Sequence, residues 1–112
     1  MEIFFRTKKL HKQCNKRKKC IKTFGQICAD KIRARLDDLI DSPNLEFVRQ
    51  YLPQARLHAL QGNRKGQYAL DLEHPKRLII KPHHNPLPEL PSGGTDLEKI
   101  TKVLVIEIDD YH

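Results

Sequence analysis

The apolar residues of this sequence change their spacing at Pro53. Before Pro53, apolar side chains recur at intervals of three to four residues among lysines, as on one face of an α-helix. After it, short runs such as residues 67–73 alternate apolar and polar side chains, which is typical of half-buried strands. The sequence therefore predicts an α+β fold in which the helices precede most of the strands.

The predicted helical part occupies the first half of the chain. Residues 2–6 are β-prone and predict a first strand. One amphipathic helix is expected over about 8–23 and a second over about 26–41, with Gly25 ending the first and Ser42-Pro43 ending the second. A short helical or irregular stretch follows, from Leu45 to Leu52.

The predicted sheet occupies the second half. Further strands are expected at residues 55–61, 67–73, 76–82 and 102–109. Two glycines favour a hairpin loop at 62–66, and prolines and glycines favour irregular structure over 82–94. Because the last strand is apolar on both faces, we expect it inside the sheet. The prediction is a single domain, 1–112, with an N-terminal strand and two-helix hairpin packed on a twisted, mainly antiparallel sheet of four to five strands.

The positive charge is concentrated at one end of the sequence. The formal net charge is +7, yet residues 1–22 alone carry +8 and the remaining residues −1. Such a basic segment can be a solvated helix face, a surface for nucleic acid or the ribosome, or a surface for an acidic partner protein.

Three cysteines and the lack of long apolar runs indicate the compartment. Cys14, Cys20 and Cys28 are odd in number and their spacing matches no zinc motif, so we expect reduced, largely buried thiols. No run reaches the 18 or so apolar residues of a membrane span, and the basic N-terminus lacks the apolar core of a signal peptide. We expect a cytoplasmic protein that does not contact membranes.

Several residues in the strand region have side chains suited to acid–base chemistry on RNA. His58 can accept or donate a proton near neutral pH, and Arg77 at the start of a strand can bind phosphate, although it can equally pair with Glu73 or Asp71. The last residues, Asp110-Tyr111-His112, follow directly on an apolar strand. We expect these three to extend from that strand onto the open face of the sheet, beside His58 and Arg77.

Three separated motifs resemble one protein family. They are a Leu-His-x-Leu-x-Gly-x-Arg-x-Gly hairpin at Leu57–Gly66, an arginine at position 77, and the final Asp-Tyr-His. Together with the basic helical segment before them, these motifs resemble the host-inhibition-of-growth (HigB) toxins, or plasmid maintenance killer proteins, of the RelE/ParE toxin superfamily. The sequence differs from some members at Gln61, where those members have a lysine thought to help bind phosphate; Lys65 is a candidate replacement.

The resemblance implies a toxin of a type II toxin–antitoxin system. Members cleave messenger RNA on the ribosome, without a metal or other cofactor, and are inhibited by an antitoxin with a helix-turn-helix domain. The resemblance implies a set of catalytic candidates from the hairpin, the arginine position and the final motif. In this set the aspartate orients a histidine or accepts the 2′-hydroxyl proton. The last histidine transfers a proton, and the tyrosine stacks on a base or binds phosphate. These candidates are His58, Arg77, Asp110, Tyr111 and His112. The expected contacts with RNA or the ribosome are Arg64, Lys65, Lys8, Lys9, Lys12, Lys16 and Lys19.

Three other functions are compatible with parts of the sequence. A toxin of the same fold can act by binding DNA gyrase, although such a protein does not need proton-transfer residues. A non-catalytic RNA-binding module is disfavoured because only Tyr68 provides an aromatic ring in the strands. A metal hydrolase using His74, His83, His84 and His112 is disfavoured because His83 and His84 are adjacent and lie in a proline-rich segment.

Overall fold

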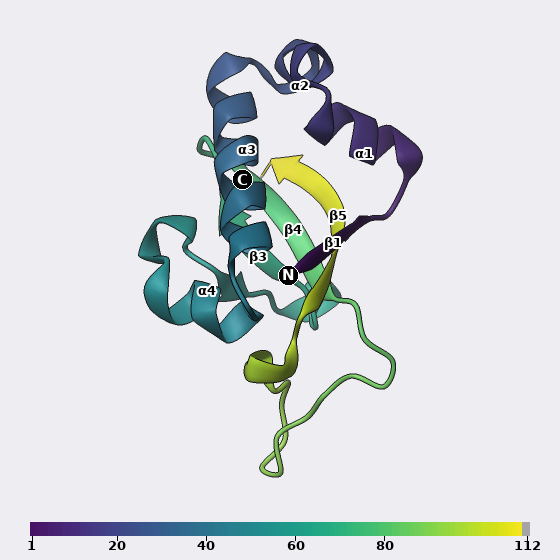
Figure 1. Cartoon of the computed structure of the whole chain (residues 1–112), viewed down its shortest axis with the longest axis vertical. Coiled ribbons are helices and arrows are strands. Elements are labelled where there is room, and N and C mark those ends of the chain that lie inside the picture. The colour runs from purple at the N-terminus through teal and green to yellow at the C-terminus, as the bar shows by residue number, and fades with distance from the viewer. Residues whose placement is uncertain (111–112) are drawn as a thin grey trace.

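A computed structural model of the chain describes residues 1–110, which form four α-helices and a five-stranded sheet (Figure 1). The strands are β1 (Glu2–Phe5), β2 (His58–Ala59), β3 (Tyr68–Asp71), β4 (Lys76–Pro82) and β5 (Lys102–Asp110). The helices are α1 (Lys8–Asn15), α2 (Arg17–Phe24), α3 (Gln26–Asp41) and α4 (Leu45–Tyr51). The predicted α+β class and the helices-first order are confirmed.

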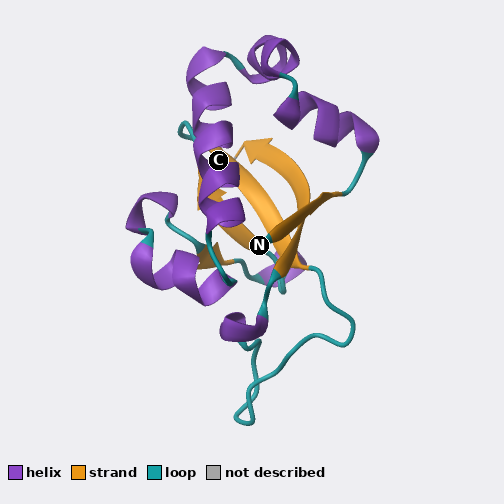
Figure 2. Cartoon of the chain, in the orientation of Figure 1, coloured by secondary structure: helices purple, strands orange, loops and turns teal. Residues whose placement is uncertain are grey.

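The sheet has the strand order β1-β5-β4-β3-β2. β1 and β5 are parallel, and the other neighbours are antiparallel. β5 therefore lies between two strands, as its apolar composition predicted. The secondary-structure view shows α3 running across one face of this sheet (Figure 2).

The predicted helix over residues 8–23 is instead two helices, because Lys16 has an extended backbone, with φ −93° and ψ 110°. Thr7 caps the first helix, accepting a hydrogen bond from Leu10 N at 3.0 Å. Cys14 and Cys20 are both buried. Six residues apart on one continuous helix, they would point in directions about 120° apart, so the break at Lys16 lets both pack on the core.

The main core lies between α3 and the sheet. Cys28, Ile32, Leu36 and Leu39 form the buried stripe of α3. Gly25 precedes the first residue of this helix, and its φ of 87° favours glycine. From the sheet, the core receives Leu70, Leu72, Leu78, Ile80, Val103 and Val105. The prediction of reduced cysteines is confirmed, since all three thiols are free and buried. Burial raises the pKa of all three, that of Cys14 to about 12.

The other face of the sheet, called the second face here, has a smaller apolar cluster made of Ala69, Ile79 and Ile106, with Leu60 packed against it. β5 contains a β-bulge at this cluster, because Ile79 pairs with Glu107 while Ile80 pairs with Val105, leaving Ile106 as the extra residue. The bulge changes which residues of β5 point to each face. Val103 and Val105 face the helices before it, and Ile108 faces them after it.

The predicted strand over residues 55–61 is almost entirely irregular. Pro53–Ala55 form a 3₁₀ turn, and Arg56 has left-handed backbone angles, φ 48° and ψ 48°. Only His58 and Ala59 pair with β3. The predicted loop at 62–66 is present and contains a second 3₁₀ turn at Gly62–Arg64.

The long segment between β4 and β5 protrudes from the end of the sheet remote from α1 and α2 (Figure 1). Its base is held by His84, whose Nε2 accepts hydrogen bonds from the backbone N–H groups of Thr101 and Lys102 at 3.1 and 3.3 Å. Within residues 1–110, no helix has the length and apolar character that crossing a membrane requires.

Candidate functional site

A cleft of about 750 Å³ opens where the short β2 segment approaches the turn between β3 and β4. The lining residues are Arg56, His58, Ala59, Leu60, Gln61, Arg64, Asp71, Leu72, His74, Pro75, Lys76 and Arg77. Three of the predicted functional residues, His58, Arg64 and Arg77, therefore line one cavity.

His58 enters the cleft from β2. It pairs with Ala69, a residue of the second face, so strand alternation points its ring to that face. The ring is half-buried, and its Nδ1 lies 2.7 Å from the carbonyl oxygen of Arg56. Since a carbonyl oxygen only accepts, Nδ1 donates this hydrogen bond, and Nε2 is the ring nitrogen left for a ligand.

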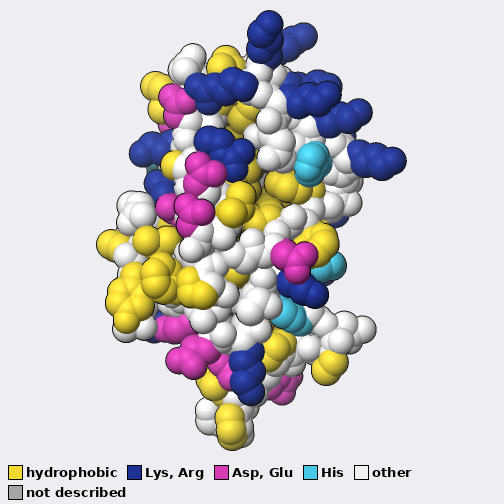
Figure 3. All heavy atoms as spheres, in the orientation of Figure 1, with side chains coloured by type: hydrophobic (Ala, Val, Ile, Leu, Met, Phe, Trp, Pro, Cys, Tyr) yellow, Lys and Arg dark blue, Asp and Glu magenta, His cyan; other side chains and the backbone are white. Residues whose placement is uncertain are grey.

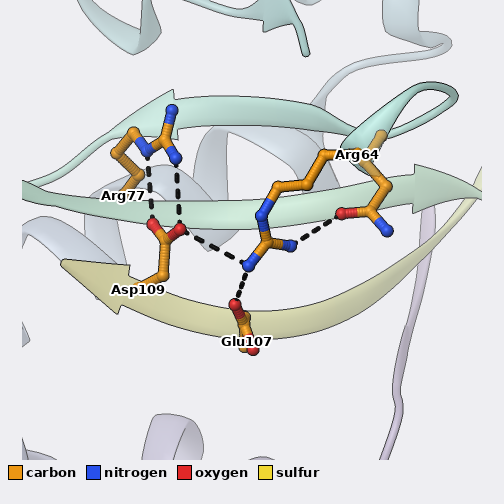
Figure 4. Close-up of polar contacts among 5 residues, drawn as sticks. Arg64, Arg77, Glu107 and Asp109 are labelled. Atoms are coloured by element: carbon orange, nitrogen blue, oxygen red, sulfur yellow. Dashed lines mark hydrogen bonds and ion pairs between the residues drawn. The ribbon is translucent and has the colours of Figure 1, made fainter. Parts of the chain in front are cut away.

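Arg77 enters the cleft from β4 and is bound by Asp109. Its Nε and one terminal nitrogen donate to the two carboxylate oxygens of Asp109 at 3.2 and 3.1 Å (Figure 4). The two residues are direct partners across β4 and β5, and both side chains are at most 17% exposed. The carboxylate of this ion pair is thus that of Asp109, and not that of Glu73 or Asp71, which the sequence offered as alternative partners.

Arg64 reaches the same carboxylate from the 62–66 loop. One terminal nitrogen donates to Glu107 Oε1 and lies 3.5 Å from Asp109 Oδ2, and the other donates to Gln67 at 2.8 Å (Figure 4). Arg64, expected from the sequence as a contact with RNA or the ribosome, thus lies over the second face and lines the cleft. Lys65 is exposed and does not line the cleft.

Each arginine of the cleft is paired with a carboxylate. Besides the two pairs above, Arg56 Nε lies 2.9 Å from Asp71 Oδ2. Asp71 is itself fixed from the helix side, because the buried Arg35 of α3 donates to its carbonyl oxygen at 3.0 Å. An anionic ligand would therefore meet guanidinium groups already held in place, and would have to compete with these carboxylates.

The predicted role of Asp110 on the open face of the sheet does not agree with the strand register. Asp110 pairs with Lys76, the neighbour of Arg77, so alternation turns it away from the face that Arg77 and Asp109 share. The physical reason is the bulge at Ile106, which moves the following residues by one position. Asp109, which was not among the residues predicted from the sequence, occupies the place expected for Asp110. Tyr111 and His112 lie outside the described residues.

The predicted basic surface lies on α1 and α2. Lys8, Lys9, Lys12, Lys16 and Lys19 are all exposed. Figure 3 shows lysine and arginine side chains gathered over these two helices. The corner between α2 and α3 lies near the cleft, since Cys28 of α3 interacts electrostatically with Lys76 and Glu73 of the β3–β4 turn.

His74, His83 and His84, the described histidines of the metal-hydrolase alternative, do not form a ligand set. His83 packs on Phe4, with ring centroids 4.8 Å apart, and His84 holds the backbone of Thr101 and Lys102. Among residues 1–110 there is no group of three or more histidine, cysteine, aspartate or glutamate side chains arranged to hold a metal ion.

No protein family model matches the sequence, and no curated protein matches it either.

Proposed function

We propose that the protein is a HigB-like toxin of the RelE/ParE superfamily that cleaves messenger RNA on the ribosome. The cleft that joins His58 to Arg56, Arg64 and Arg77 is the observation that supports this proposal most. An imidazole beside several guanidinium groups is a suitable set for breaking a phosphodiester bond by proton transfer and charge stabilisation.

The proposed reaction uses the RNA as its own nucleophile. A base removes the proton of a 2′-hydroxyl group, the 2′-oxygen attacks the adjacent phosphorus, and the bond from phosphorus to the 5′-oxygen breaks. The 5′-oxygen takes up a proton, leaving a 2′,3′-cyclic phosphate and a 5′-hydroxyl group. His58 exchanges a proton with the substrate, and the arginines stabilise the negative charge that develops on the phosphoryl oxygens.

In this proposal the arginines of the cleft hold the phosphate group, because carboxylates fix their guanidinium groups in place. Asp109 and Glu107 hold Arg77 and Arg64 in defined positions, so these guanidinium groups need little reorganisation when charge develops nearby. The exposed lysines of α1 and α2 would supply the general attraction to ribosomal RNA. In this proposal a helix-turn-helix antitoxin keeps the protein inactive.

Incubating the purified protein with ribosomes carrying a defined messenger RNA tests the proposal. We expect RNA fragments with 2′,3′-cyclic phosphate ends, formed only when ribosomes are present. A parallel incubation with DNA gyrase and plasmid DNA tests the alternative mechanism, in which the toxin binds gyrase. Intact RNA on the ribosome together with inhibited supercoiling would refute the nuclease and favour gyrase binding.

A further inference from the structure

The only described residue other than glycine with a positive φ is Arg56, two positions before His58. Left-handed backbone angles are sterically unfavourable for a residue other than glycine, so the surrounding contacts must maintain them. Three contacts of Arg56 maintain these angles, through its backbone N–H, its side chain and its carbonyl oxygen. Arg56 N donates to Pro53 O at 3.1 Å, its Nε binds Asp71, and its carbonyl oxygen accepts from His58.

We propose that Arg56 is a positioning residue that acts on His58 through its main chain. The carbonyl oxygen of Arg56 fixes the proton of the neutral ring on Nδ1, which makes Nε2 the nitrogen that exchanges a proton with the substrate. This role rests on the proposed nuclease function. In free histidine the neutral ring favours the proton on Nε2, so the contact reverses the ordinary preference and gives Nε2 the lone pair.

Asp71, a residue of β3, links Arg56 to α3. Its carboxylate holds the Arg56 side chain, and its carbonyl oxygen is bound by Arg35, which is 6% exposed and also paired with Asp38. The conformation of Arg56 is thus connected, through β3, to the helix that covers the other face of the sheet. The guanidinium of Arg56 is largely exposed, so its charge is screened and the main-chain contact is the more specific one.

Two substitutions of Arg56 separate the main-chain role from the charge. Arg56→Gly and Arg56→Val both remove the guanidinium, but glycine adopts positive φ without strain and β-branched valine does not. If Arg56 acts through its carbonyl oxygen, the glycine variant should cleave RNA about tenfold or more faster than the valine variant. Equal loss in both variants would assign the role to the charge and overturn the proposal.

The position of the proton on His58 can be measured without any RNA. Two-bond ¹H–¹⁵N correlation spectra of the uniformly ¹⁵N-labelled wild-type protein, above the titration of the ring, report which nitrogen carries the proton. We expect protonated Nδ1 in the wild type and in Arg56→Gly. A wild-type spectrum with the proton on Nε2 would overturn the proposal.

These two measurements distinguish failure of this inference from failure of the proposed function. A wild-type protein with protonated Nδ1 that cleaves no RNA on ribosomes would refute the nuclease, and with it the catalytic meaning of the contact. Active cleavage with the proton on Nε2 would leave the nuclease in place and remove Arg56 from its mechanism.

Discussion

Arg77 and Asp109 face each other across β4 and β5 and are joined by two hydrogen bonds, at 3.2 and 3.1 Å. Asp109 also lies 3.5 Å from Arg64, so a single carboxylate connects two arginines of the cleft (Figure 4). Asp109 is therefore a shared partner of both guanidinium groups.

Replacing Asp109 by asparagine should destabilise the protein. Arg77 is 14% exposed, and its two charge-assisted hydrogen bonds to the Asp109 carboxylate would be weakened. We expect the free energy of unfolding to fall by about 1–3 kcal/mol, measured by urea denaturation. Asp110→Asn is the matched control, and because Asp110 is exposed it should change this value by less than about 0.5 kcal/mol. Equal effects of the two variants would contradict the register described for β5.

The lysines of α1 and α2 should control the salt dependence of RNA binding. In a variant with Lys12→Glu, Lys16→Glu and Lys19→Glu, binding to ribosomal RNA should weaken, and the slope of log K against log salt should become shallower by about 0.7–0.9 for each phosphate that a lysine no longer neutralises. Lys81→Glu, Lys99→Glu and Lys102→Glu together change the net charge equally, at exposed positions away from these helices. If this second variant weakened binding as much, total charge rather than the helical surface would be responsible.

Stability should decrease at alkaline pH because of the buried thiols. Burial raises the pKa of Cys14 from 9.0 to about 12. The folded state therefore keeps a proton that the unfolded state loses, and the stabilising contribution is complete below pH 9 and is lost as the pH rises towards 12. The slope for one such group is at most about 1.4 kcal/mol per pH unit. Urea denaturation between pH 8 and pH 11 should show a steeper decrease for the wild type than for Cys14→Ala; parallel curves would contradict the assignment.

Removing Tyr111 and His112 tests the part of the prediction that rests on the family resemblance alone. We expect cleavage on the ribosome to fall about 100-fold or more if either residue transfers a proton or binds the scissile phosphate. A truncated protein that cleaves at the full-length rate would exclude both residues from the mechanism.

Much of the fold could be predicted because the local signals were strong. The apolar stripe of α3, the glycine at position 25 and the apolar β5 correctly indicated a covering helix, the end of the helix before it and an inner strand. The break at Lys16 was missed because the lysines around it continue the helical pattern without a proline or glycine. The near absence of β2 was missed because the left-handed angles of Arg56 depend on contacts with distant Asp71.

The error over the two aspartates has a definite physical origin. If β5 alternated regularly from Val103, Asp109 would face the helices and Asp110 would face the cleft. The extra residue at Ile106 reverses this order. One signal was present in the sequence, because apolar residues occupy positions 103 and 105 but then 106 and 108. That change of alternation predicts a bulge.

The cleavage rate of a His58→Gln variant on ribosomes saturated with messenger RNA is the most direct test of the cleft as a nuclease site. Single-turnover rates should be compared with the wild type and with His83→Gln, a control at an exposed histidine outside the cleft. We predict a rate for His58→Gln that is lower by about 100-fold or more, with ribosome binding retained and the control at the wild-type rate. A folded His58→Gln protein that cleaves as fast as the wild type would contradict the assignment of catalysis to this cleft.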